Sequence, residues 1–283
     1  MTEPAVTALL AVKDYRADYL SEAVGSLLQQ SSPRWRAVVI HPAQIRARLE
    51  ADLGEAADDP RIELVEERGR KLAGALNTGM RAARTEFTAI LFADDLWELH
   101  AVEALERAIG ERPDVDFFHS ARRYVDDHGA SISDVIGPRE DVTAETFAAG
   151  GSIKHLLCWR RELALTIGGM DETLSSVGPD DYDFPWSMAE AGARFGSIPE
   201  CLYVYRDHRS CYRLTTNLPL RTHVRETRRI LRKHGVPRAE VRRRVAAARE
   251  GYLRQCLYSS PFDAWLKRLL RRDPARGWRE SYR

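Results

Sequence analysis

The chain has 283 residues, which suffices for one large α/β domain with an appendage or for two small domains. Hydrophobic residues make up 44% of it, which excludes a globally disordered chain, and no segment approaches the roughly 20 apolar residues that a membrane-spanning helix needs. The net charge of +1 conceals an asymmetry, because the segment 221–283 alone holds 19 Lys and Arg against 6 Asp and Glu. The two parts of the chain are therefore expected to do different jobs.

Residues 1–120 alternate between strand-like and helix-like patterns. Short apolar runs predict strands at residues 6–12, 35–41, 61–67 and 86–93. Apolar positions three and four residues apart predict helices at residues 17–30, 44–54, 71–84 and 101–112. This alternation predicts βαβ units, and hence an α/β fold with a mainly parallel sheet covered by helices on both faces. Ligands of such sheets bind at the carboxyl ends of the strands.

The rest of the chain divides into a less regular part and a helical part. Short strands are predicted within residues 116–121, 153–159 and 201–206, and helices at residues 220–235 and 238–258. The predicted domains are accordingly 1–217, an α/β domain, and 218–283, a basic helical C-terminal extension.

Cysteine spacing and the first residues bear on the compartment. The four cysteines are scattered without a C-x-x-C pair, so neither a disulfide framework nor a zinc knuckle is indicated. The opening "MTEPAVTALLAVKDY" lacks the basic start and the cleavage site of a secretory signal. We expect a reduced protein in the cytoplasm.

Two adjacent carboxylates, Asp94 and Asp95, follow the apolar run "AILFA". One explanation is a helix N-cap with an acidic first turn, which suits Asp95 and the helix after it. The other is a divalent cation such as Mg²⁺, which takes carboxylate and phosphate oxygens together and would remove the repulsion between the two side chains. The pair alone leaves both explanations open.

A second acidic group and a basic segment lie further along the chain. Asp180, Asp181 and Asp183 occur among aromatic residues in "GPDDYDFPW", so this segment is expected to pack rather than to float. A carboxylate with one side against aromatic rings is a candidate general base with a raised pKa. The segment "YRDHRSCYRLTT" places His208 among arginines, directly after a predicted strand, and arginine suits phosphate.

These elements, in this order, resemble an inverting nucleotide-sugar glycosyltransferase of family 2 with the GT-A fold. The likeness covers roughly residues 5–215. It rests on "LAGALNTGMRAARTEFTAILFADDLW", which is similar to the family's A-x-N-x-G helix, D-x-D strand end and D-x-W, and on "IGGMDETL" with "PDDYDFPW". "LYVYRDHRS" resembles the family's Y-R-x-H element. The resemblance implies a glycosyltransferase of the hexosyltransferase type (EC 2.4).

The resemblance implies a role for particular residues. Asp94 falls on the last aspartate of the D-x-D and would bind a divalent cation, Mn²⁺ or Mg²⁺, together with His208. Asp181 falls on the catalytic base, with Asp183 and Trp186 beside it on the acceptor. The residues expected to bind the donor are Ala11, Lys13, Asp14, Lys71, Asn77, Asp95, Arg206 and Arg209.

The chain departs from the family pattern at three places. Phe92 replaces the first D-x-D acid, whose ribose contact Asp95 is expected to supply. The family's D-D-G-S appears as "HPAQ" at 41–44, and its P-x-Y-N as "AVKD" at 11–14. The implied reaction is one in-line displacement: Asp181 deprotonates an acceptor hydroxyl, which attacks the anomeric carbon of a nucleoside-diphosphate sugar and inverts it.

Two rival functions remain. A nucleotidyltransferase would share the fold and the metal, but the loop after the first strand has no glycine. A catalytically inactive GT-A binding module would explain Phe92 and "HPAQ". The expected partners are a nucleotide-sugar donor and a sugar, lipid-linked or small-molecule acceptor, and no nucleic acid.

The basic C-terminal region allows three interpretations. Its helices can pack against the acidic domain, form a homodimer contact, or touch anionic lipid as a peripheral membrane surface. The segment 262–272, "FDAWLKRLLRR", with leucines and a tryptophan beside four cations, is the best candidate for lipid contact.

Overall fold

A computed structural model describes residues 3–175, 177–207 and 218–258 of the chain. In chain order the first half contains β1 (Val6–Ala11), α1 (Ala17–Leu28), β2 (Trp35–His41), η1 (Ala43–Ile45), α2 (Arg46–Leu53), η2 (Gly54–Asp58), β3 (Ile62–Glu66), α3 (Lys71–Ala82), β4 (Phe87–Ile90), β5 (Leu96–Trp97) and α4 (Ala101–Glu111). The second half contains β6 (Phe117–Val125), α5 (Ala144–Ala148), β7 (Leu157–Arg160), α6 (Arg161–Thr166), η3 (Pro179–Asp183), α7 (Phe184–Glu190), β8 (Phe195–Arg206), α9 (Leu220–Lys233) and α10 (Arg238–Tyr258).

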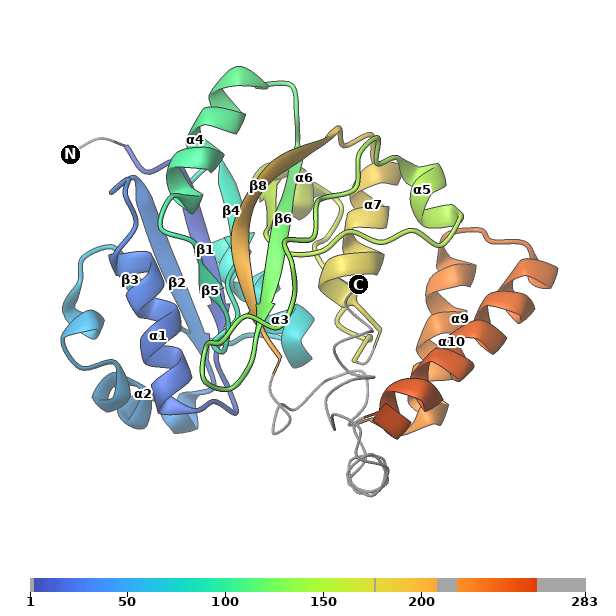
Figure 1. The fold of residues 1–283 in the computed structure, drawn as a ribbon, viewed down its shortest axis with the longest axis horizontal. Coiled ribbons are helices and arrows are strands. Elements are labelled where there is room, and N and C mark those ends of the chain that lie inside the picture. The colour runs from blue at the N-terminus through green and yellow to red at the C-terminus, as the bar shows by residue number, and fades with distance from the viewer. Residues whose placement is uncertain (1–2, 176, 208–217, 259–283) are drawn as a thin grey trace.

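The described strands form one mixed sheet in the order β3-β2-β1-β4-β7-β6-β8-β5 (Figure 1). Strands β1 to β4 pair in parallel, as βαβ units require. Strand β7 runs antiparallel to both β4 and β6, and β8 is again parallel to β6. The residues that precede β7 therefore reach the same edge of the sheet as the residues that follow β4, β6 and β8.

Each face of the sheet carries its own core, because alternate residues of a strand point to opposite faces. On β1, Leu10 belongs to the cluster under α1, α2 and α4, whereas Leu9 belongs to the cluster under α3, α6 and α7. The predicted α/β fold with a mainly parallel sheet flanked by helices is thereby confirmed. The strands and helices predicted in residues 1–120 all exist, with ends displaced by at most three residues.

The basic extension begins as two helices that contact the second core. Ile230 and Leu231 of α9 are buried in that core. Figure 1 shows α9 and α10 together at the end of the molecule that also holds α5 and α7. Glu226 accepts a hydrogen bond from the Ser175 backbone at 2.8 Å, and Arg244 of α10 donates one to the Ala148 carbonyl at 2.6 Å. The interpretation that these helices pack against the rest of the chain agrees with these contacts. The division at residue 217 stays a prediction, and residues 262–272 lie outside the described residues.

A two-glycine turn after α6 fixes the position of α3. The amide of Asn77 donates to the Met170 carbonyl at 2.9 Å, and the Met170 N–H donates to Asn77 Oδ1 at 2.8 Å. Gly168 and Gly169 both have positive φ angles, of 87° and 77°. A Cβ at Gly169 would lie 2.3 Å from Asn77 Oδ1, whereas a Cβ at Gly168 would meet nothing within 4 Å. Only Gly169 is therefore required for the close approach of Asn77.

The two glycines form a matched pair of variants. Gly168→Ala should lower the free energy of unfolding by about 1–2 kcal/mol, the cost of a left-handed backbone with a side chain. Gly169→Ala should cost at least about 2 kcal/mol more, because the new methyl group breaks both hydrogen bonds between Asn77 and Met170. Urea unfolding of both variants measures the difference, and equal losses would contradict this role of Asn77.

Candidate active site

The edge of the sheet where β4 and β8 end is organised around the buried carboxyl group of Asp95. Asp95 is 1% exposed. Its Oδ2 accepts a hydrogen bond from the Tyr203 hydroxyl at 2.7 Å, and its Oδ1 accepts one from the Arg206 backbone N–H at 2.7 Å. The backbone N–H of Phe92 in turn donates to the Tyr203 oxygen at 3.4 Å. These bonds connect the end of β4 to the end of β8 through the interior.

Burial, and next the negative charge of Asp94, raise the pKa of Asp95 well above its usual value. Asp95 is thus a structural group whose two oxygens are occupied. It does not cap α4 either, because that helix begins at Ala101 with His100 as its N-cap residue. The helix-cap interpretation of Asp95 is therefore wrong, and its donor contact stays a prediction.

Arg206 is also occupied by the protein itself. Its side chain is 2% exposed, forms an ion pair with Glu22, and lies over the ring of Tyr19 at 4.3 Å. Its Nε donates to the backbone carbonyl of Asp94 at 3.0 Å. The guanidinium group of Arg206 thus holds the Asp94 backbone from inside the protein, and its donor contact stays a prediction.

Asp94 is consequently the half-buried carboxylate that this edge presents. Within residues 3–175, 177–207 and 218–258, no three His, Cys, Asp or Glu side chains gather in a way that could hold a metal ion. One carboxylate at a strand end suits a divalent cation that takes its other ligands from a diphosphate and water. His208 and Arg209, assigned by sequence to the metal and the donor, lie outside the described residues.

The remaining residues assigned to the donor follow β1 and begin α3. Lys13 and Asp14 are exposed just beyond β1, and Ala11 is half-buried at its end. Lys71 is exposed at the start of α3, where its Nζ donates to the Thr173 carbonyl at 2.6 Å. Asn77 is 3% exposed and holds the two-glycine turn, and its donor contact stays a prediction.

The three carboxylates of the acidic segment 180–183 each bind a different partner. Asp181 forms a salt bridge with Lys154, and its side chain is 18% exposed. Asp180 is buried and bonds His155 Nε2 at 2.9 Å. Asp183 is fully buried and pairs with Lys233 at 2.7 Å and His234 at 3.1 Å. The turn of η3 is what separates neighbouring side chains in this way.

Asp183 and Trp186 contact the end of α9, and their acceptor contact stays a prediction. The ring of Trp186 is 1% exposed and stacks on His234, with ring centroids 4.0 Å apart. Buried side chains of this kind stabilise the packing of α9.

Lys154 and His155 reach the site because β7 runs antiparallel to β4. The ring of Phe92 lies edge-on to His155, with centroids 5.0 Å apart. Phe92 therefore fills the place of the missing acid with an aromatic contact. The sequence predicts residues 153–159 as one strand and assigns no role to Lys154 or His155. An apolar pattern predicts a strand but does not indicate whether the strand runs parallel or antiparallel to its neighbours.

The charges around Asp181 determine its protonation state. Burial alone would raise the pKa of Asp181, but the positive charges of Lys154 and His155 and the hydrogen bond from Lys154 hold that pKa below its usual value. The negative charge of Asp181 raises the pKa of Lys154 in turn. At neutral pH Asp181 is therefore ionised, and its pKa is lowered where the sequence predicted a raised one.

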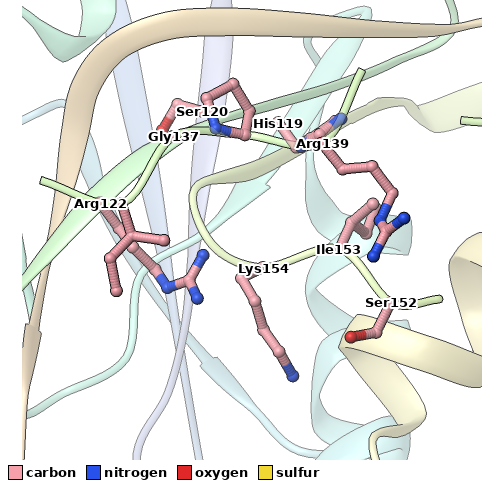
Figure 2. Close-up of a pocket in the computed structure, with 10 residues that line it drawn as sticks. His119, Ser120, Arg122, Gly137, Arg139, Ser152, Ile153 and Lys154 are labelled. Atoms are coloured by element: carbon pink, nitrogen blue, oxygen red, sulfur yellow. The ribbon is translucent and has the colours of Figure 1, made fainter. Parts of the chain in front are cut away.

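Asp181 opens on a cavity of about 510 Å³ that is lined by the segment before β7, by η3 and by α9 and α10. Lys154 and Ser152 separate it from a second cavity of about 480 Å³, which Figure 2 shows. The two cavities are neighbours that share these two residues.

Comparison with known proteins places the chain in a family. Residues 10–156 match the glycosyl transferase family 2 (Glycos_transf_2). The O-antigen biosynthesis protein RfbC of Myxococcus xanthus is 25% identical over 206 residues, which are 72% of this chain and 16% of that protein. The chain thus spans about a sixth of the length of this curated relative.

Two solved structures share the fold. Staphylococcus aureus TarS 1–349 in complex with UDP-GlcNAc superposes with a TM-score of 0.61 at 15% identity, over 89% of this chain and 72% of that one. The mannosyltransferase PcManGT from Pyrobaculum calidifontis, in complex with GDP-Man and Mn²⁺, gives a TM-score of 0.57 at 19% identity, over 98% and 84%. In the described part of this chain, no helix combines the length and the hydropathy needed to cross a membrane.

Asp95 can be tested apart from catalysis. Asp95→Ala leaves the Tyr203 hydroxyl and the Arg206 N–H buried without a partner, so the free energy of unfolding should fall by about 2–4 kcal/mol. Asp95→Asn keeps the bond from the Arg206 N–H through its amide oxygen, and its amide nitrogen can donate to the Tyr203 oxygen, so it should lose less than the alanine variant. Chemical denaturation measures both values. A larger loss for the asparagine variant than for the alanine variant would contradict the structural role.

Proposed function

The chain belongs to glycosyl transferase family 2, and on that basis we propose that it transfers a sugar from a nucleoside-diphosphate sugar to an acceptor hydroxyl with inversion. The observation that carries the proposal is the pair of carboxylates with different surroundings at one sheet edge. Asp94 is half-buried beside the exposed loop after β1, and Asp181 opens on a cavity of about 510 Å³. The first suits a donor diphosphate with its cation, and the second suits an acceptor.

The donor site consists of the ends of β1 and β4 and the start of α3. Exposed Lys13 and Lys71 supply positive charge for a diphosphate, and Asp94 supplies a ligand for Mn²⁺ or Mg²⁺. When bound, such a cation neutralises the charge that develops on the leaving diphosphate. The bond from Arg206 to the Asp94 backbone keeps this carboxylate in place before the donor arrives. TarS with UDP-GlcNAc and PcManGT with GDP-Man and Mn²⁺ make uridine and guanosine donors the first to test.

The acceptor step is assigned to Asp181. Its carboxylate takes the proton of the acceptor hydroxyl as the hydroxyl oxygen bonds to the anomeric carbon and the bond to the diphosphate breaks. Lys154 keeps the carboxylate ionised before the reaction. The attack on the side opposite the leaving group inverts the anomeric carbon. The inactive binding module is the alternative, and donor hydrolysis decides between the two.

Donor binding should require a divalent cation. Calorimetric titration with UDP and with GDP, in Mn²⁺ and in EDTA, should give binding of at least one nucleotide in Mn²⁺ and at least tenfold weaker binding in EDTA. Asp94→Asn should weaken binding in Mn²⁺ by at least tenfold, because it removes the carboxylate ligand. Asp95→Asn is the matched control and should bind like the wild type. Equal affinity in EDTA would refute the metal assignment.

Asp181→Asn should lower turnover by about 10² to 10⁴ while the affinity for the nucleotide stays near wild type, because the variant keeps the size and loses the basicity. Hydrolysis of the donor by water provides the assay when no acceptor is at hand. Asp183→Asn is the control: it should lower the melting temperature through its lost pairing with α9 but keep turnover. Full turnover in Asp181→Asn would place the base elsewhere.

A further inference from the structure

Among the residues that the structure describes, three cations and no acidic side chain line the cavity of about 480 Å³ next to Asp181. Arg122 enters it from β6, Arg139 from the segment after Gly137, and Lys154 from the segment before β7 (Figure 2). Ser120 and Ser152 add hydroxyl groups to the lining. Because like charges in one cavity repel each other, such a site is more stable when an anion occupies it.

The two arginines are available for a ligand. Among the described residues neither Arg122 nor Arg139 forms an ion pair, whereas many other arginines of this chain do. Arg122 Nε donates to the Tyr124 hydroxyl at 3.1 Å, which holds the side chain without neutralising it. Arg139 is exposed at the mouth. Guanidinium groups bind phosphate and carboxylate oxygens in pairs of parallel hydrogen bonds.

A buried histidine also lines the cavity. His119 is 1% exposed, and its Nε2 has no hydrogen-bond partner among the described residues. Burial, followed by the charges of Arg122 and Arg139, lowers its pKa to about 4. The ring is therefore neutral at physiological pH, so the positive charge of the cavity comes from the arginines and Lys154.

We propose that this cavity binds an anionic group, a phosphate or a carboxylate, that the acceptor carries near its reacting hydroxyl. The inference rests on the proposed function, because Lys154 lines this cavity and pairs with Asp181, the assigned base. One acceptor could thus place its anion between Arg122 and Arg139 and its hydroxyl at Asp181. The acceptor class is then an anionic sugar, such as a sugar phosphate or a uronic acid, and not a neutral sugar.

Binding of small probes tests the proposal without a known acceptor. Glucose, glucose 6-phosphate and glucuronate are titrated into the full chain in EDTA, so that no divalent cation directs phosphate to Asp94. We expect at least one of the anionic probes to bind at least tenfold more tightly than glucose. Comparing the two anionic probes distinguishes a phosphate site from a carboxylate site.

Arginine variants place the binding in this cavity. Arg122→Gln and Arg139→Gln should each weaken binding of the anionic probe at least fivefold, and Arg139→Lys should restore most of it. Arg249→Gln, which removes an exposed arginine of α10, should bind like the wild type. Melting temperatures confirm that each variant is folded. Binding of nucleoside diphosphate with Mn²⁺ should be unchanged in Arg139→Gln.

Several outcomes would overturn the proposal. They are equal binding of glucose and both anionic probes, no binding of any probe to the wild type, unchanged binding in both glutamine variants, or loss of nucleotide binding in Arg139→Gln, which would make the cavity part of the donor site. Failure of the proposed function would look different, since nucleotides would then fail to bind the wild type while the anionic probes still bound.

Discussion

The buried carboxyl group of Asp95 is the constraint on which the site depends. It sits between the ends of two strands that are separated in the sheet by β7 and β6, and it bonds to the second strand through Tyr203 and the Arg206 backbone. The side chain of Arg206 donates a hydrogen bond to the backbone carbonyl of Asp94 and forms an ion pair with Glu22 on α1. A buried carboxyl group without hydrogen-bond partners would lower the stability of the fold, so Asp95 requires both Tyr203 and the Arg206 backbone. Together they hold Asp94 where a substrate can reach it.

The acceptor side is held by a second set of contacts, which follows from the direction of β7. Because β7 is antiparallel to β4, Lys154 and His155 arrive at the catalytic edge just before that strand begins. His155 bonds Asp180 and packs on Phe92, and Lys154 pairs with Asp181. Of the two neighbouring aspartates, Asp180 is thus held by His155 and Asp181 opens on the cavity of about 510 Å³. Phe92, which breaks the family pattern, is explained by the histidine that it contacts.

Much of the fold could be predicted from the sequence, because the parallel half of the sheet consists of strands with local apolar runs and helices with regular spacing. Strand β8 was harder: its first half, "FGSIPE", has no continuous apolar run, so residues 201–206 alone were predicted. The sequence predicts which residue types occupy the motif positions, but it does not predict how deeply each side chain is buried or which residues it contacts. Asn77, Arg206, Asp183 and Trp186 match motif positions, yet each is buried against a partner far away in the chain. Such partners are set by tertiary packing, which spacing within one segment does not encode.

The central claim is a single displacement at the anomeric carbon with water or an acceptor hydroxyl activated by Asp181. Proton NMR of the sugar first released by donor hydrolysis tests it most directly, with UDP-GlcNAc and GDP-mannose as donors and the spectrum recorded before mutarotation. The account predicts that the released sugar has the anomeric configuration opposite to that of the donor. A sugar released with the configuration of the donor would contradict it, because retention requires a second displacement or a different path.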